Sequence, residues 1–356
     1  MSDEPKIRPA ITDLPTYKAG KKVAGVAGLD PYKLSSNENP TQPLPGVLKA
    51  IADAALEINR YPDPFVTELT NALAKKFNVA PEMIATGTGS VGVCQQIMQA
   101  VAGSGDEVIY AWRSFEAYPI ITKIVGAKPV EVPITKSGEH DLAAMLNAIT
   151  EKTRLILICT PNNPTGSVVN HEELKAFLTK VPKDILVVID EAYVEFNRDD
   201  KSVKGLDFLR EFTNVGVLRT FSKAYGLASL RVGFFIGPEH VAEAVRKTAV
   251  PFGVSNIAQV AAVASLEFED ELFVRVEELV QLRTWFESQL SEMGFNLPPS
   301  QANFVWLPLG DRVDEFTAAC ATQAVAVRPF SGEGVRISIG EKSALERLLK
   351  VLPDFV

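Results

Sequence analysis

Four short and almost wholly apolar segments, separated by helix-like stretches, constrain the fold of this chain more than any other feature. Continuous runs of Val, Ile and Leu are typical of strands buried on both faces, and such strands occur in largely parallel sheets with helices on either side. The sequence therefore predicts an α/β fold whose ligands lie beyond the carboxyl ends of the strands. The four predicted strands are 107–110, 155–159, 185–189 and 215–218.

The regions before and after these strands differ from them in amino-acid composition and pattern. The first 45 residues, rich in Pro, Gly and Asn, read as an extended arm, and the region after residue 260 reads as a small α+β unit with a long, broken helix. We expect an N-terminal arm (1–45) that joins the small domain, a large domain (46–260) and a small domain (261–356). Predicted helices cover 45–58, 65–77, 91–101, 115–125, 172–180 and 257–290, and later strands cover 303–307, 324–327 and 335–339.

Composition excludes several classes of partner. The chain has 356 residues, is 46% apolar and carries a net charge of −8, so it has no basic surface for nucleic acid or an anionic membrane. Its three cysteines are far apart and are expected to be reduced and mostly buried. With no apolar signal segment and no apolar run of about 18 residues, a cytoplasmic protein without a metal is the expectation.

A glycine-rich segment, Gly87-Thr88-Gly89-Ser90-Val91-Gly92, precedes the predicted helix 91–101. It matches the G-x-G-x-x-G dinucleotide pattern, which is weak evidence alone. A nicotinamide site also needs an acidic residue after the next strand, whereas this strand ends in Tyr110-Ala111-Trp112. The feature that remains is a helix N-terminus with free N–H groups, which favours a phosphate site over a purely structural turn.

Two further strand ends carry polar residues. Strand 155–159 runs into Asn162-Asn163-Pro164-Thr165-Gly166, and strand 185–189 runs into Asp190-Glu191-Ala192-Tyr193. A lone aspartate in this position is more often a helix cap than a catalytic group. Asp190 therefore needs support from elsewhere.

The end of strand 215–218 supplies that support. Lys223 follows Phe221 and Ser222, lies among aromatic and small residues, and precedes Arg231 by eight positions. A lysine is usually a surface charge, but these surroundings favour a desolvated amine with a lowered pKa, which is the condition for a nucleophile. Arg231 and the Ser222 hydroxyl are suitable phosphate partners.

Taken together, these motifs resemble the fold-type I pyridoxal-phosphate aminotransferases. The matching segments are Ser222-Lys223 with Arg231-Val232-Gly233, Asn163-Pro164-Thr165-Gly166 and Asp190-Glu191-Ala192-Tyr193. Within that group Ser35-Ser36-Asn37-Glu38-Asn39-Pro40 is similar to the histidinol-phosphate aminotransferase subgroup. The resemblance spans nearly the whole chain, and it implies a large domain with a mostly parallel seven-stranded sheet and a smaller α+β domain.

The resemblance also implies a role for each matching residue. Lys223 would carry the pyridoxal phosphate as a Schiff base and move the proton, while Asp190 pairs with the ring nitrogen. Asn163 and Tyr193 would bond the ring's 3′-oxygen, and Phe115 would stack on the ring, although Arg113-Ser114 stands where many relatives have Pro-Thr. The remaining cofactor contacts, all to the phosphate, would come from Ser222, Arg231, the N–H groups of Gly89, Ser90 and Val91, and Tyr61 of a second subunit in a homodimer.

The substrate follows less directly. Arg336 matches the arginine that holds the substrate's anionic end, with Arg328 as a second candidate, and Asn37 and Tyr17 lie on an arm that closes over the substrate in relatives. The arm resembles aromatic amino acid aminotransferases, which predicts transfer from phenylalanine, tyrosine or tryptophan to 2-oxoglutarate. Histidinol-phosphate aminotransferase is the alternative, and a decarboxylase or aldolase on the same fold also remains open.

Overall fold

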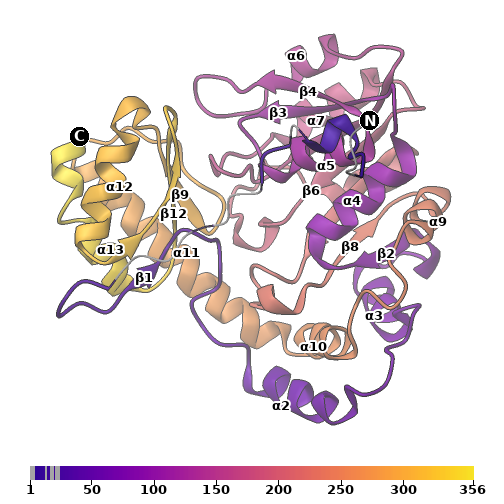
Figure 1. Ribbon diagram of the computed structural model, residues 1–356, viewed down its shortest axis with the longest axis horizontal. Coiled ribbons are helices and arrows are strands. Elements are labelled where there is room, and N and C mark those ends of the chain that lie inside the picture. The colour runs from indigo at the N-terminus through magenta and orange to yellow at the C-terminus, as the bar shows by residue number, and fades with distance from the viewer. Residues whose placement is uncertain (1–4, 13, 17–19, 21–24) are drawn as a thin grey trace.

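A computed structural model describes residues 5–12, 14–16, 20 and 25–356. Figure 1 shows a large body built on a twisted sheet and a smaller body that carries the C-terminus, with the long helix α11 (Glu269–Glu292) running between them. The predicted α/β architecture is confirmed. The exact domain boundaries stay predictions.

The large body contains a seven-stranded sheet with the order β2-β8-β7-β6-β5-β3-β4. Five neighbouring strands are parallel, whereas β8 runs antiparallel to both β7 and β2. The four strands expected from sequence are β3, β5, β6 and β7. The strands are β2 (Ile84–Gly87), β3 (Glu107–Trp112), β4 (Lys128–Pro133), β5 (Thr153–Cys159), β6 (Leu186–Asp190), β7 (Val215–Thr220) and β8 (Gly233–Ile236).

Alternate residues of the central strands enter two separate cores. In β5, Leu155 and Leu157 pack into one apolar cluster and Ile156 and Ile158 into the other, because successive side chains point to opposite faces. Both faces are covered, so these strands read as unbroken apolar runs. Helices α4 (Gly89–Val101), α5 (Ala117–Val125) and α9 (Glu239–Lys247) cover one face, and α6 (Leu142–Asn147), α7 (His171–Lys180) and α8 (Gly205–Glu211) the other.

Local signals explain several helix ends. The Asn170 side chain accepts hydrogen bonds from the backbone N–H groups of Glu172 and Glu173, which begins α7. Gly126, with φ of 92°, ends α5 in the left-handed conformation that favours glycine. The predicted break in the long helix lies at Phe268, between α10 (Asn256–Glu267) and α11. The large body also carries α2 (Pro45–Ala54) and α3 (Thr67–Phe77), and the arm, expected to be extended, contains one helical turn, α1 (Pro9–Thr12), which contacts α5.

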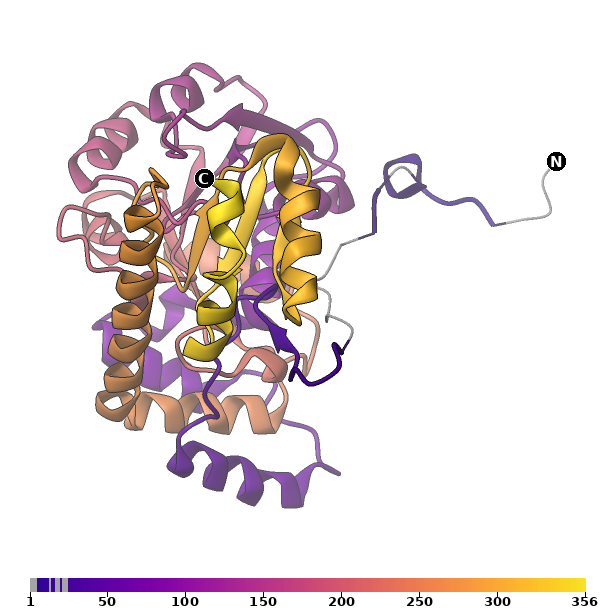
Figure 2. The same cartoon turned by 90° about the vertical axis from the view of Figure 1, so that its left-hand side faces the viewer.

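The small body contains an antiparallel sheet with the order β11-β12-β9, formed by Arg328–Phe330, Gly334–Ser338 and Phe304–Leu307. Its helices α12 (Val313–Thr322) and α13 (Lys342–Leu348) lie beside this sheet in Figure 2. From the arm, β1 (Tyr32–Lys33) pairs in parallel with β10 (Val325–Ala326). Ser35 and Asn37, which follow β1, are therefore held against the small body.

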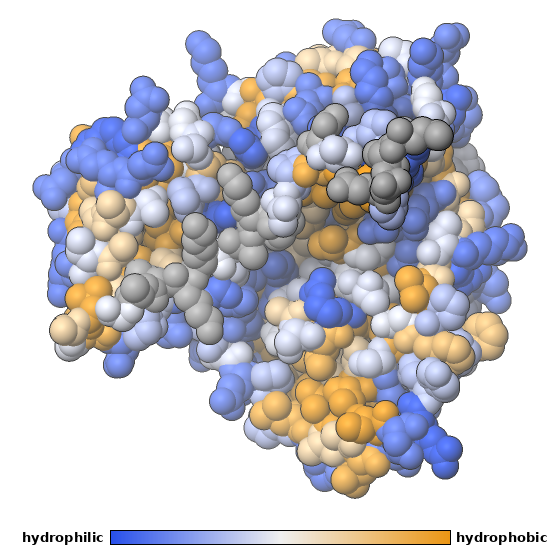
Figure 3. All heavy atoms as spheres, viewed as in Figure 1, coloured by the Kyte–Doolittle hydropathy of each residue, from blue (hydrophilic) through white to orange (hydrophobic). Residues whose placement is uncertain are grey.

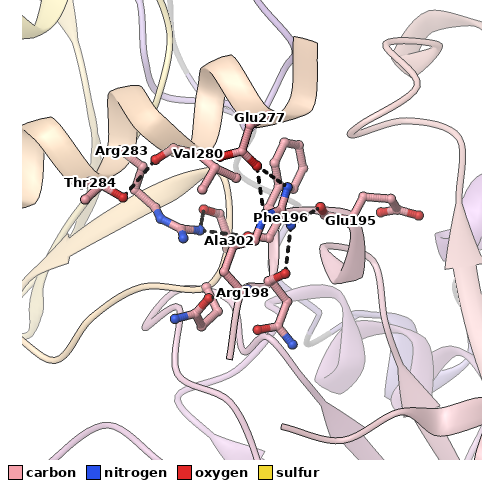
Figure 4. Close-up of polar contacts among 10 residues, drawn as sticks. Glu195, Phe196, Arg198, Glu277, Val280, Arg283, Thr284 and Ala302 are labelled. Carbon is pink, nitrogen blue, oxygen red and sulfur yellow. Dashed lines mark hydrogen bonds and ion pairs between the residues drawn. The ribbon is translucent and has the colours of Figure 1, made fainter. Parts of the chain in front are cut away.

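Helix α11 is tied to the segment that follows β6 (Figure 4). Arg283 is buried and donates to the carbonyl oxygens of Phe196 (3.2 Å) and Ala302 (2.8 Å). Arg198 bonds Glu277 of the same helix through two guanidinium nitrogens, each at 3.0 Å. These contacts connect the small body to the chain just beyond the end of β6.

Other properties agree with the sequence. All three cysteines are buried and unpaired, as expected. Across the part of the chain that the structure describes, no helix is long and apolar enough to cross a membrane.

The double-sided burial of the sheet gives a test of the fold. Val188 of β6 is fully buried, whereas Val274 of α11 is 62% exposed. Val188→Ala should lower the free energy of unfolding by about 2 kcal/mol, because it removes two buried methylene equivalents and leaves a cavity. Val274→Ala, which removes the same atoms, should change it by less than about 0.5 kcal/mol in urea denaturation followed by tryptophan fluorescence. Equal effects would contradict the assigned burial of β6.

Candidate active site

A cavity of about 260 Å³ lies where the carboxyl ends of β5, β6 and β7 face the small sheet. Residues from segments far apart in the sequence line it, as the rule for parallel sheets predicts. A larger hollow of about 770 Å³ lies elsewhere, around 63–66 and 246–254, and holds none of the predicted catalytic groups. The cavity residues predicted from sequence are Asn37, Ser90, Val91, Phe115, Asn163, Asp190, Tyr193, Ser222, Lys223, Arg231, Arg328 and Arg336.

Asp190 is the last residue of β6 and its carboxyl group is buried. Burial raises its pKa to about 6, and two hydrogen bonds oppose this effect. The Tyr118 hydroxyl donates to Oδ2 at 2.6 Å, and the Ala192 N–H donates to Oδ1 at 3.2 Å. The result is a carboxylate held at the bottom of the cavity and able to pair with a cationic group.

Lys223 lies just after β7 and projects into the same cavity. Burial, followed by the positive charges of Arg336 and Arg231, lowers its pKa to about 8. Its Nζ atom lies 5.7 Å from the centre of the Tyr193 ring. At neutral pH the Lys223 amine is therefore unprotonated, and so nucleophilic, in part of the protein molecules.

One end of the cavity combines an arginine with the N-terminus of a helix, and these groups could hold an anion. Arg231 Nη1 donates to Ser222 Oγ (3.1 Å) and to the Ala228 carbonyl (2.8 Å), and no carboxylate among the described residues lies within ion-pair distance of it. The guanidinium group of Arg231 lies very close to Gly89, the first residue of α4. A Cβ atom added at Gly89 would lie only 2.3 Å from Arg231 Nη2. A Cβ at Gly233 would lie 2.5 Å from the backbone nitrogen of Ser90. The two glycines thus allow a cation and free helix N–H groups to meet.

A hydrogen-bond network joins the large body, the arm and the small sheet beside Lys223. Asn37 Nδ2 donates to the Tyr193 hydroxyl (2.9 Å), and Ser338 Oγ donates to Asn37 Oδ1 (2.8 Å). Arg336 donates to Asn163 Oδ1 (2.7 Å) and to the Ser35 carbonyl (3.1 Å). The strand β12 thereby places Ser338 and Arg336 against residues from two other parts of the chain.

A further contact between the two bodies is an ion pair formed by the register partner of Arg336. Arg328 Nη2 lies 2.6 Å from Glu116 Oε2, and both residues line the cavity. Phe115, which precedes Glu116, packs its ring against Tyr118 edge-on at 5.5 Å. Phe115 also faces the cavity, as expected for an aromatic that covers a ligand ring.

Three predicted site residues lie apart from this group. Gly89 does not line the cavity, but it lies against the guanidinium group of Arg231. The Tyr61 side chain is 84% exposed and contacts Phe252, outside the cavity. Tyr17 lies outside the described residues.

The sequence interpretation missed Tyr118 and Glu116. Tyr118 is three residues after Phe115, a spacing that places two side chains on one side of a helical turn, so a signal existed. Glu116 had no such signal because its partner is 212 positions away. Among the residues that the structure describes, no cluster of His, Cys, Asp or Glu could hold a metal ion.

Comparisons with known proteins agree with this geometry. Residues 30–352 match the model of the family described as aminotransferase class I and II. An aromatic amino acid aminotransferase of Streptomyces avermitilis is 58% identical over 99% of this chain and 98% of its own, and one of Thermobifida fusca is 53% identical over 94% and 93%. A histidinol-phosphate aminotransferase of Sinorhizobium meliloti, solved with pyridoxal-5′-phosphate, superposes with a TM-score of 0.87 at 29% identity, over 99% of this chain and 98% of its own.

The buried carboxyl group predicts a pH dependence of stability. Folding raises the pKa of Asp190 from its ordinary value of 3.8 to about 6. The folded state therefore binds this proton more tightly than the unfolded chain, and its stability rises as the pH falls from about 6 to about 4. Asp190→Asn, measured in protein freed of small molecules, should be more stable than wild type by about 3 kcal/mol at about pH 7.5, with no difference near pH 4.

Denaturation midpoints at the two pH values measure this effect. Asp314→Asn, on the exposed surface of α12, controls for the loss of one carboxylate. A constant difference between wild type and Asp190→Asn across the range would contradict the raised pKa.

Proposed function

The chain belongs to the class I and II aminotransferases, and from that premise we propose that it transfers the amino group of aromatic L-amino acids to 2-oxoglutarate with pyridoxal phosphate as cofactor. The family, and the relative solved with pyridoxal-5′-phosphate, imply this cofactor. The observation that carries the proposal is that Lys223, Asp190 and Arg231 line one cavity. They supply an amine for the aldehyde of this cofactor, a carboxylate for its ring nitrogen and a cation for its phosphate.

The cavity fits the cofactor at each of these ends. Its phosphate would lie against Ser222, Arg231 and the N–H groups of Ser90 and Val91. The absence of side chains at Gly89 and Gly233 allows these groups to come close together. Asp190 would face the ring nitrogen. The remaining contacts would be Asn163 and Tyr193 to the 3′-oxygen and Phe115 against the ring.

When bound, pyridoxal phosphate supplies an aldehyde that captures amines and a ring that withdraws electrons. The carboxylate of Asp190 would hold a proton on the ring nitrogen, and the Tyr118 hydrogen bond helps to keep that carboxylate ionised. Lys223 would attach the cofactor and, once substrate has displaced it, accept and return the substrate's α-proton. Its pKa of about 8 suits an acid–base group near neutral pH.

The substrate's anionic end would bind at Arg336. A guanidinium group binds a carboxylate with two parallel hydrogen bonds, and Arg336 is held in place by Asn163 and the Ser35 carbonyl. Arg328 is its register partner on β11, and Asn37 donates a hydrogen bond to the Tyr193 hydroxyl.

Phenylalanine, tyrosine and tryptophan are the proposed donors. The names of relatives at 58% and 53% identity support this choice over histidinol phosphate, whose aminotransferase is the 29% identical structural relative. The cytoplasmic location stays a prediction from the sequence.

We also propose a homodimer. Apolar residues gather on the surface over α2 and the adjoining loops in the lower part of Figure 3, and exposed apolar patches often mark interfaces. The rings of Tyr61 and Phe252 lie 4.7 Å apart, tilted by 34°, within this exposed group, and a partner subunit would bring its phosphate site to Tyr61. The exposed apolar residues here are Leu48, Leu56, Ile58, Tyr61, Phe65, Val250 and Phe252.

The role of Lys223 can be tested by chemical trapping. Borohydride treatment of the purified protein should fix the cofactor on the peptide that contains Lys223, as read by mass spectrometry. Lys223→Ala should abolish this label and lower the rate of transamination by about 10³-fold or more, because the proton-transfer group is lost. Lys136→Ala, at an exposed lysine, should retain both. A label on any other lysine would refute the assignment.

The proposed donor can be tested by steady-state kinetics with 2-oxoglutarate as acceptor. We expect kcat/KM for phenylalanine to exceed that for histidinol phosphate by more than about tenfold, a difference of about 1.4 kcal/mol in transition-state binding. The reverse order would establish the alternative donor.

A further inference from the structure

Arg328 and Arg336 are paired across two neighbouring strands. They are register partners in the antiparallel pair β11–β12, so their side chains leave the same face of the sheet about 5 Å apart at Cβ. Both are buried, and both line the active-site cavity. An anion that binds on this side of the cavity therefore meets two neighbouring guanidinium groups.

Glu116 neutralises one member of the pair. Its Oε2 atom lies 2.6 Å from Arg328 Nη2, and the side chains are only 28% and 11% exposed. Glu116 itself faces the cavity, directly after Phe115. In such a partly buried place a charge is weakly screened by solvent, so the carboxylate acts on any ligand that enters.

The two candidate donors differ at this end in charge as well as in shape. A carboxylate carries one negative charge, whereas a phosphate monoester carries about 1.5 to 2 at neutral pH. A phosphate bound between the two arginines would have to displace Glu116 from Arg328 or remain beside it. Like charges placed together are a common means of rejecting the wrong partner.

We propose that Glu116 is a specificity-determining residue, an inference that rests on the proposed function. Its ion pair with Arg328 makes the anion site selective for a carboxylate and against a phosphate monoester. Arg336 then binds the carboxylate, and Glu116 repels the additional charge of the phosphate.

A neighbouring ion pair separates this role from a purely structural one. Arg113 also joins the two bodies: its Nε atom bonds Glu333 Oε2 at 2.8 Å, and its guanidinium group lies over the rings of Trp112 and Phe330. Glu333 does not line the cavity. Glu333→Gln therefore loosens a contact between the same two bodies and leaves every residue of the cavity wall unchanged, which makes it a control for Glu116→Gln.

The test uses two amino donors that differ only at the anionic end, phenylalanine and phenylalaninol phosphate, with the cofactor-loaded enzyme. Glu116→Gln should raise the ratio of kcat/KM for the phosphate over the carboxylate donor by at least about tenfold, mainly through KM. Glu116→Asp, which keeps the charge, and Glu333→Gln should keep the ratio of the wild type. The double variant with Glu116→Gln and Arg328→Gln should lose this increase in the phosphate-to-carboxylate ratio, because the Arg328 guanidinium group that Glu116→Gln leaves unpaired is then absent.

Binding of two analogues without an amino group, 3-phenylpropionate and 3-phenylpropyl phosphate, gives a second measurement that does not depend on turnover. Inhibition constants or calorimetry should show the same shift in preference for Glu116→Gln. An unchanged preference, or an equal change in Glu333→Gln, would overturn the role of Glu116. A wild type that binds both analogues but transfers no amino group from phenylalanine would instead refute the proposed function.

Discussion

Burial of the seven-stranded sheet on both faces is the constraint on which the rest of the molecule depends. Between two apolar cores, the interior positions of β5, β6 and β7 cannot hold unpaired polar groups without a large penalty. The polar side chains are therefore confined to the strand ends. Because these strands are parallel, Asn163, Asp190 and Lys223 reach the same edge of the sheet from three separate stretches of chain.

The site is completed only where the small sheet meets that edge. Arg336 bonds Asn163 of the large body and the Ser35 carbonyl of the arm, while Ser338 bonds Asn37, which in turn bonds Tyr193. Any movement of the small sheet relative to the large one must break several of these bonds at once. One shared network thus positions Arg336, Asn163 and Tyr193 beside Lys223.

The sequence predicted the parts of this arrangement that depend on local pattern. Strands 155–159 and 185–189 were found because burial on both faces leaves a continuous apolar run. In contrast, β4 (Lys128–Pro133) alternates apolar residues with Lys128, Glu131 and two prolines, which an edge strand tolerates, and β2 and β8 have only four residues each. The Tyr118–Asp190 bond and the Glu116–Arg328 pair were not predicted, since each depends on distant residues brought together by the fold.

The pKa values of Asp190 and Lys223 both depart from their ordinary values, and burial is the main cause at each residue. Burial raises the pKa of Asp190 to about 6 and lowers that of Lys223 to about 8, so each group is closer to neutrality than it would be in water. The Tyr118 hydrogen bond works against burial at Asp190, whereas Arg336 and Arg231 reinforce it at Lys223. The two arginines of the cavity thus add to the effect of burial in lowering the proton affinity of the amine.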